Sequence, residues 1–278
     1  MDKNKIKSGI LGLIVGDALG VPVEMKKRVE LDANPVTEMT GYGTWNQPPG
    51  TWSDDSSLTL CLIASLTNGY KLENIGEMFV KWYRSGLFTP HGKNFGTGKA
   101  TTDAIEKLIQ GADPYYLGSS DERSNGNGSL MRILPLAYFL KTREFKERAK
   151  IIAEVSAITH SHRRSILACE IYIDLAINLL NGIDKNTAYT LTKNTIKKCY
   201  SEDNELKTFC RILDDNIYEY KRDEISASPY VVHTLEAALW CFLKFDSYKE
   251  VVLNAVNLWQ DADTTAAVAG VQVHGTYI

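Results

Sequence analysis

The sequence lacks the features of a membrane, secreted or nucleic-acid-binding protein. Its five cysteines lie far apart and form no C-x-x-C pair, so no disulfide framework is predicted and the thiols are expected to be reduced. The net charge is only −3, which excludes the strongly basic surface that general nucleic-acid or anionic-membrane binding requires. The apolar stretch near the N-terminus contains Gly16 and Asp17 and predicts neither a signal peptide nor a membrane span. We therefore expect a cytoplasmic protein.

Strand-like alternation of apolar and polar residues is also scarce, and apolar residues recur at helical spacing instead. Residues 21–51 contain four prolines and three glycines and are predicted to form one long loop, a kind of segment that is often functional. No repeat, low-complexity tract or linker divides the chain, so we predict a single compact all-α domain over residues 1–278. Helices are predicted over 6–20, 56–68, 73–85, 99–110, 129–141, 144–158, 163–181, 185–199, 203–215, 230–244, 247–258 and 263–276.

Two acidic clusters stand at predicted helix starts near opposite ends of the chain. They are Ser53-Asp54-Asp55 and Asp261-Ala262-Asp263-Thr264, and each alone suits helix capping. Together they offer four carboxylates with no neighbouring lysine or arginine, and such carboxylates repel one another unless a cation joins them. Oxygen ligands suit Mg²⁺ or Mn²⁺, while the histidines form no zinc-type pair. Spacing alone leaves open whether the clusters meet.

Two glycine-containing segments are candidates for contact with a ligand. Asn125-Gly126-Asn127-Gly128-Ser129 and Gly96-Thr97-Gly98 each precede a predicted helix. Glycines allow close backbone approach and a helix N-terminus favours negative charge, so the first segment suits a diphosphate; its alternative is a plain turn. His160 either contacts the ligand or supports the neighbouring loops. Arg132 either binds phosphate or braces the first segment.

Five segments spread over the chain carry a resemblance to a known family. They are Gly12 to Gly20 with Pro22 and Glu24, Trp52 to Ser56, Asn125 to Ile133, Thr159 to His162, and Asp261 to Gly270. Taken in order, they resemble the ADP-ribosylglycohydrolase family, which includes ADP-ribosylarginine and ADP-ribosylserine hydrolases. The resemblance implies an all-α fold with a cleft that holds two Mg²⁺ ions, with Mn²⁺ as an alternative. Its implied metal ligands are Ser53, Asp54, Asp55, Asp261, Asp263 and Thr264.

The resemblance also implies a reaction, the hydrolysis of the bond between the distal ribose of ADP-ribose and its acceptor. Such cleavage passes through an oxocarbenium-like state and needs an acid and a base-activated water. Glu24 and Asp55 are the candidate proton-transfer residues, although Glu24 has the alternative of an exposed side chain beside basic residues. Asp17 is expected to hydrogen-bond backbone or cap a helix. The implied substrate-binding residues are Gly96, Gly98, Asn125, Gly126, Asn127, Gly128, Ser129 and His160.

Two positions depart from the family pattern. Phe95 is followed by Gly96 where the dinitrogenase reductase branch has an aspartate, which weakens the case for an arginine-linked substrate. Trp259-Gln260 replaces small residues before the second acidic cluster and is predicted to narrow the pocket or to shift the substrate.

Three alternatives to hydrolysis of ADP-ribose linkages remain at this stage. The chain is a structural, crystallin-like relative; or it binds ADP-ribose or blocks a toxin as an immunity factor; or it is another Mg²⁺-dependent phosphohydrolase. Loss of metal ligands would mark the first, yet all six ligand positions carry oxygen side chains. The acceptor stays open: a protein side chain, a nucleic acid or a small molecule.

Overall fold

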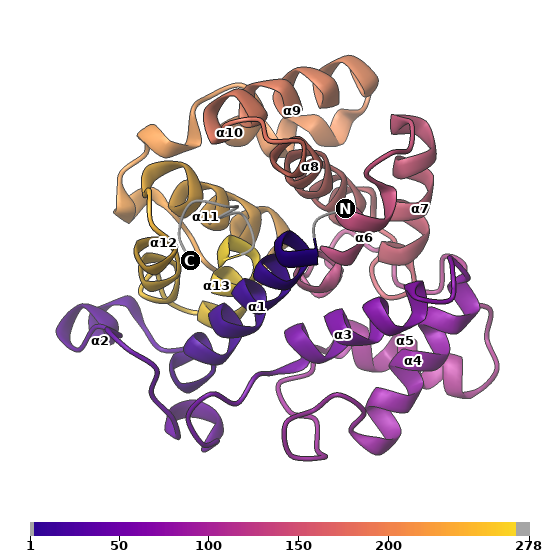
Figure 1. The fold of residues 1–278 in the computed structure, drawn as a ribbon, viewed down its shortest axis with the longest axis horizontal. Coiled ribbons are helices and arrows are strands. Elements are labelled where there is room, and N and C mark those ends of the chain that lie inside the picture. Colours follow the sequence, from indigo (N-terminus) through magenta and orange to yellow (C-terminus); the bar gives the residue numbers. More distant parts are fainter. Residues whose placement is uncertain (1–2, 271–278) are drawn as a thin grey trace.

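The computed structural model describes residues 3–270, which fold into helices joined by turns (Figure 1). Within this range only isolated β-bridges occur and no sheet forms, which confirms the all-α prediction. The helices share one hydrophobic core; a single domain over all of 1–278 stays a prediction. The α-helices are α1 (Lys3–Gly20), α2 (Arg28–Ala33), α3 (Asp54–Leu66), α4 (Leu72–Ser85), α5 (Lys99–Ile109), α6 (Pro135–Leu140), α7 (Phe145–Ala157), α8 (Arg163–Leu180), α9 (Lys185–Cys199), α10 (Cys210–Leu213), α11 (Val231–Lys244), α12 (Tyr248–Val256) and α13 (Ala262–Gly270).

Most predicted helices are confirmed to within a few residues, but the prediction of one helix over 129–141 is wrong. A short 3₁₀ segment, η3 (Leu130–Arg132), is followed by α6, which begins at Pro135. Proline has no N–H to donate inside a helix, but it is well tolerated in the first turn, where that N–H has no partner. Residues 263–270 of the helix predicted over 263–276 are helical, within α13, and residues 271–276 lie outside the described residues.

Two further predictions need correction. Residues 203–215 form mostly 3₁₀ helix, η4 (Asn204–Phe209), and only a four-residue α10. Their apolar residues Leu206, Phe209 and Ile212 recur every three residues, which is the 3₁₀ period. Residues 21–51 are not all loop, since they contain α2 and two 3₁₀ segments, η1 (Val21–Val23) and η2 (Gly43–Trp45).

Glycines allow α1 and α13 to pack backbone to backbone, and this is the most extensive helix contact in the fold. A Cβ added at Gly16 would overlap the carbonyl oxygen of Ala266, and one at Gly20 would overlap the Cα of Asp263. The start of α13 is therefore held directly against the end of α1.

Replacing Gly16 with alanine is expected to lower the free energy of unfolding by about 2–3 kcal/mol, because two helix backbones must separate to admit one methyl group. Gly76, inside α4, is the matched control, since a Cβ there meets only side-chain carbons at 3.5 Å or more. Gly76→Ala should be neutral or stabilising by about 0.5–1 kcal/mol, as expected from helix propensity. Urea denaturation of both variants measures the difference; equal midpoints would contradict this packing.

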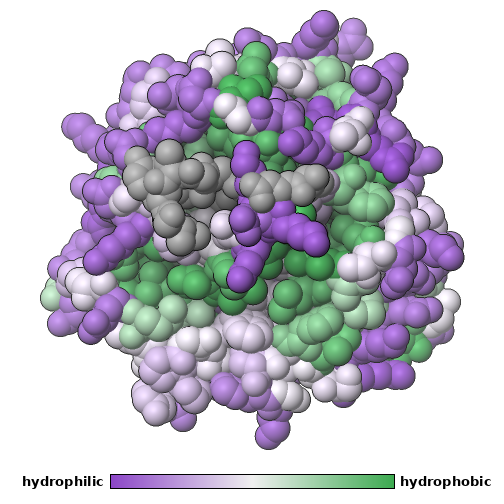
Figure 2. Space-filling view, viewed as in Figure 1, coloured by the Kyte–Doolittle hydropathy of each residue, from purple (hydrophilic) through white to green (hydrophobic). Residues whose placement is uncertain are grey.

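Residues Lys3–Val23 are long and apolar enough, by length and composition, to cross a membrane. Two-thirds of that stretch is buried inside the protein, however, and α1 packs against α13, α12 and α3. Figure 2 shows hydrophobic residues across the middle of the face over which α1 runs, framed by hydrophilic residues. Leu11 and Val15 of α1 are 45% and 40% exposed. These properties are those of a core helix with one partly exposed edge.

Candidate metal and substrate site

The two acidic clusters, which lie about two hundred residues apart in the sequence, meet at the end of α1. Asp17 of α1 accepts hydrogen bonds from the backbone N–H groups of Ser53 and Ser56, at 3.0 Å each, and from the Ser56 hydroxyl. It thereby satisfies donors at the start of α3 that have no partner inside the helix. Asp17 therefore has the predicted structural role. Because Gly20 packs on Asp263, α1 joins both clusters.

The first cluster caps its helix and also presents free oxygen atoms. Ser53 is the N-cap of α3: its Oγ accepts from the backbone N–H of Asp55 at 3.3 Å and donates to Asp55 Oδ2 at 3.1 Å. Asp55 Oδ1 is buried and has no hydrogen-bond partner. A buried carboxylate oxygen without a partner is costly, and a cation would supply what it lacks. Capping and metal binding are thus compatible here.

The second cluster is joined by a carboxylate from outside it. Carboxylate oxygens of Glu24, Asp261 and Asp263 lie within 4.8 Å of one another. Glu24 is half-buried and accepts a hydrogen bond from the indole N–H of Trp45, so the alternative of an exposed side chain is wrong. Asn127, in the glycine-rich segment, donates to Asp261 Oδ2 at 2.6 Å and thereby links that segment to the acidic cluster.

Burial raises the pKa of every carboxyl in the acidic cluster at the end of α1, and neighbouring negative charges raise the pKa values of several of these carboxyls further. The pKa of Asp54 rises to about 8, first through burial and then through the charges of Asp17 and Glu24. Burial raises the pKa of Glu24 to about 7, against the lowering effect of the Trp45 hydrogen bond. The pKa values of Asp55 and Asp263 lie well above their usual range for the same reasons. Such crowding of oxygen ligands suits a hard divalent cation.

A second group of potential ligands, Glu122, His162 and Glu205, has a different character. Arg164 lies between its carboxylates, 2.8 Å from Glu122 and 2.8 Å from Glu205. The guanidinium already neutralises these carboxylates, so no further cation is needed. By contrast, no lysine or arginine within residues 3–270 forms an ion pair with the carboxylates at the end of α1.

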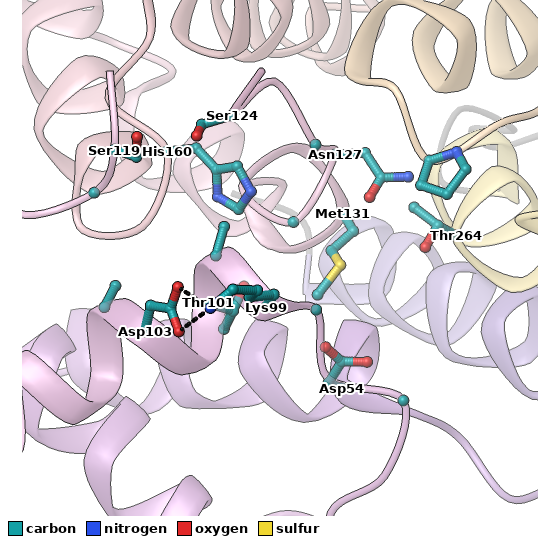
Figure 3. A pocket seen from close by; sticks show the side chains of 18 of the residues that line it. Asp54, Lys99, Thr101, Asp103, Ser119, Ser124, Asn127, Met131, His160 and Thr264 are labelled. Atoms are coloured by element: carbon teal, nitrogen blue, oxygen red, sulfur yellow. Dashed lines mark hydrogen bonds and ion pairs between the residues drawn. The ribbon is translucent and has the colours of Figure 1, made fainter. Parts of the chain in front are cut away.

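A pocket of about 550 Å³ opens over the acidic cluster, a volume typical of small-molecule sites. Figure 3 shows Asp54 and Thr264 toward one end, Asp103 and Ser119 toward the other, and His160 and Lys99 between them. The predicted residues that line it are Glu24, Asp54, Asp55, Gly96, Gly98, Gly126, Asn127, Gly128, His160, Asp261, Asp263 and Thr264. Other residues of the predicted loops and segments also line the pocket: Lys99, Ala100, Thr101, Ser124 and Met131. The lining residues that the sequence motifs did not indicate are Asp103, Ala104, Lys107, Leu117, Gly118, Ser119, Arg123 and Pro229.

Three predicted site residues do not line this pocket, and their side chains bond elsewhere. Asn125 donates to Glu122 O and accepts from the Ser165 hydroxyl, while Ser129 is fully buried beside Cys169. The prediction that these two side chains contact a ligand in the pocket is therefore not supported by their positions. Ser53 lies behind Asp55, to which its hydroxyl donates.

Trp259 and Gln260 do not narrow the pocket, because neither side chain lines it. Their backbone explains why small residues fit at these positions. Trp259 has φ +116° and Gln260 has φ +51°, conformations that favour glycine and cost a side-chain-bearing residue free energy. Backbone hydrogen bonds hold the segment in place: Met25 N–H donates to Gln260 O, and Gln260 N–H donates to Lys26 O. The departure from the family pattern therefore affects the support of Glu24 and Asp261, not the pocket wall.

An acidic cluster and a glycine-rich loop that share one pocket of an all-α fold are the arrangement of a helical hydrolase. The family model for ADP-ribosylglycohydrolases matches residues 2–273, so the chain belongs to this family and is a glycosidase-type hydrolase.

Known relatives match nearly the whole chain. The ADP-ribosylarginine hydrolase Tri1 of Serratia proteamaculans is 31% identical over 96% of this chain and 70% of its own length. The ADP-ribosyl-[dinitrogen reductase] glycohydrolase of Rhodospirillum rubrum is 30% identical over 96% of this chain and 83% of its own. A solved structure described as an ADP-ribosylglycohydrolase-related protein complex superposes with a TM-score of 0.79 at 31% identity, covering 96% of this chain and 84% of the other.

Proposed function

We propose that this protein is a cytoplasmic, Mg²⁺-dependent hydrolase that removes ADP-ribose from a modified protein by cleaving the bond at the anomeric carbon of the distal ribose. The observation that supports this most strongly is the convergence of Glu24, Asp54, Asp55, Asp261 and Asp263 in one pocket that the glycine-rich backbone also lines. A cluster of carboxylates alone would repel. A cation-bridged cluster beside an anion-binding loop suits a substrate with vicinal hydroxyls and a diphosphate.

The carboxylates and Thr264 would hold two Mg²⁺ ions, with Mn²⁺ as an alternative. Bound there, the ions would provide a fixed site for the ribose hydroxyls and would lower the pKa of a water molecule. Glu24 is the proposed proton-transfer residue. Its pKa of about 7 suits both the donation and the removal of a proton near neutral pH. Asp55 is the second candidate, and its buried, unpartnered Oδ1 suits metal binding at least as well.

The glycine-rich segment would bind the diphosphate of ADP-ribose. Gly126 and Gly128 line the pocket beside His160, so a ligand meets backbone there with no Cβ in the way. Arg132 takes no direct part, because it is buried beneath the segment, where it donates to Gly128 O and Thr159 Oγ1. The guanidinium therefore braces the segment, one of the two roles considered from the sequence.

ADP-ribosylarginine is the first acceptor to test, since two relatives named ADP-ribosylarginine hydrolase match 96% of this chain. Gly96 has φ +76°, a conformation that side-chain-bearing residues rarely adopt, and an ideal Cβ there would lie 3.6 Å from Asp54 Oδ1 and 3.8 Å from the Trp45 ring. The wall beside the acidic cluster thus differs from that of relatives with an aspartate. A protein that only binds ADP-ribose, or blocks a toxin, is the second candidate; the complete set of carboxylates favours turnover.

The decisive experiment compares arginine-, serine- and DNA-linked ADP-ribose as substrates, with and without Mg²⁺. We expect release of ADP-ribose from at least the arginine linkage, dependent on Mg²⁺ or Mn²⁺. Binding of free ADP-ribose without turnover of any linkage would favour the binding-only candidate, and activity unaffected by chelation would contradict the proposed metal dependence.

Replacing Trp45 with phenylalanine removes the indole hydrogen bond that holds Glu24. Because this bond lowers the Glu24 pKa, its loss should shift the corresponding limb of the pH–rate profile upward. It should also reduce kcat/KM about tenfold, the effect of losing a hydrogen bond to a charged group. Trp52→Phe is the matched control, since the Trp52 indole donates only to Phe88 O. A Trp45→Phe profile that superimposes on that of the unmodified protein would exclude this role for Glu24.

A further inference from the structure

Arg132 is a buried cation without a carboxylate partner. Its side chain is 0% exposed, lies over the ring of Phe79 with 4.9 Å to the centroid, and forms no ion pair within the described residues 3–270. Its guanidinium donates to Gly128 O and, at 2.7 Å, to Thr159 Oγ1. An arginine carries only donors, so the direction of each of these hydrogen bonds is fixed. Thr159 Oγ1 must act as the acceptor.

Because Thr159 Oγ1 accepts from Arg132, its hydroxyl hydrogen is directed toward His160. Besides Arg132, the Thr159 hydroxyl contacts His160 Nδ1 at 2.8 Å, and Thr159 is 1% exposed. If Nδ1 carried the ring hydrogen, two donors would point at Thr159 Oγ1 and its own hydrogen would be buried without an acceptor. If Nδ1 is bare, the Thr159 hydroxyl donates to it and the hydroxyl hydrogen is paired. The second arrangement leaves the ring hydrogen on Nε2.

His160 Nε2 lies at the glycine-rich segment of the pocket. An ideal Cβ at Gly126 would be 3.3 Å from Nε2, and one at Gly128 would be 2.9 Å from Cε1. Figure 3 shows the ring projecting into the pocket beside the loop that carries Ser124 and Asn127. Burial, and after it the charge of nearby Arg132, lowers the pKa of His160 to about 3, so the ring presents an uncharged N–H to the pocket.

We infer that Arg132 and Thr159 are positioning residues that fix His160 as the Nε2–H tautomer, so that the ring acts as a neutral hydrogen-bond donor to an oxygen of the bound ligand. A neutral donor aimed at an oxyanion needs no proton uptake on binding. The assignment of the tautomer is independent of the proposed function. The identity of the ligand oxygen, which would belong to the diphosphate or a ribose of ADP-ribose, rests on the proposed function.

The first test is ¹⁵N NMR of the histidine rings in the ligand-free protein, with the His160 signals assigned by their loss in His160→Gln. We expect the protonated nitrogen to be Nε2 and the bare nitrogen to be Nδ1. A protonated Nδ1 in the unmodified protein would overturn the inference, whatever the protein's activity.

The second test is isothermal titration with ADP-ribose. Thr159→Val, which keeps the shape but not the hydroxyl, should shift the tautomer population and weaken binding about tenfold. Thr159→Ser should restore both. Thr192→Val is the matched control, because Thr192 is a buried threonine whose hydroxyl bonds Asp174, outside the pocket. An unchanged tautomer and affinity in Thr159→Val would overturn the inference. If the unmodified protein shows the Nε2–H tautomer but does not bind ADP-ribose, the tautomer assignment stands and the proposed function fails.

Discussion

Replacing Asp263 with asparagine is expected to lower kcat/KM for ADP-ribosylarginine by about a thousandfold or more while making the metal-free protein more stable. The loss in rate follows from removal of a carboxylate at the proposed metal position, where cations supply several kcal/mol of transition-state stabilisation. The gain in stability follows from the surroundings of Asp263, which is buried beside Glu24 and Asp261 and has its pKa raised well above the usual range by burial and by their charges. An amide of the same shape removes that repulsion.

The matched control is Asp174→Asn. Asp174 is also buried, but Arg148 lies 3.1 Å away and Thr192 donates to it, so losing its charge leaves an unpaired arginine and should destabilise the protein by about 1–3 kcal/mol. Activity corrected for folded protein should be unchanged. Thermal unfolding in chelator, together with initial rates, measures both properties. Asp263→Asn with full activity, or one as destabilised as Asp174→Asn, would contradict the account.

Divalent cations are expected to stabilise the protein, and more so as the pH rises. The pKa values of Asp17, Glu24 and Asp54 are raised to about 6, 7 and 8 by burial. A carboxyl whose pKa is higher in the folded than in the unfolded protein still holds its proton at pH values where the unfolded chain has released it. Its contribution to the free energy of unfolding is therefore complete below the pKa of the unfolded state, and it is lost as the pH rises through the pKa of the folded state. Metal-free protein should therefore lose stability between about pH 6.5 and pH 8.

Mg²⁺ at a hundred times its Kd should add about 2.7 kcal/mol, which for a chain of this size raises Tm by roughly 5 °C. His160 does not disturb this window, since its pKa is lowered to about 3 and its own stability loss occurs as the pH falls below about 6.5. Calorimetry at pH 6.5 and pH 8, with Mg²⁺ or with chelator, tests the expectation. Equal stability at both pH values in the presence of chelator, or a Tm that does not change when Mg²⁺ is added, would argue against a metal site.

Local pattern was enough to predict most of the helices, because apolar spacing and caps are short-range signals. The start of α3 shows this well: Ser53 is its N-cap, as the sequence implied. Pattern failed where a three-residue period resembled a helical one, in 203–215, and where Pro135 interrupted an apolar run. Both differences have local causes, the spacing of apolar residues in 203–215 and the proline at the start of α6.

The site could be predicted only in part, since its parts meet through tertiary contacts. That the two acidic clusters converge came from family resemblance; the physical cause is the backbone contact of α1 with α13, combined with the hydrogen bonds from Asp17 to α3. Sequence spacing carried no sign that Trp45 holds Glu24 or that Thr159 connects Arg132 with His160. Asn125 and Ser129 share a segment with the pocket-lining Gly126 and Asn127, but their own side chains bond to Glu122, Ser165 and Cys169, which do not line the pocket.

Anomalous diffraction from crystals soaked in Mn²⁺ tests most directly whether the two acidic clusters form a metal site. The account predicts manganese peaks among the carboxylates of Asp54, Asp55, Asp261 and Asp263, which disappear in Asp263→Asn. Manganese bound at Glu122, His162 and Glu205 instead, or no peak within the pocket at saturating Mn²⁺, would contradict it.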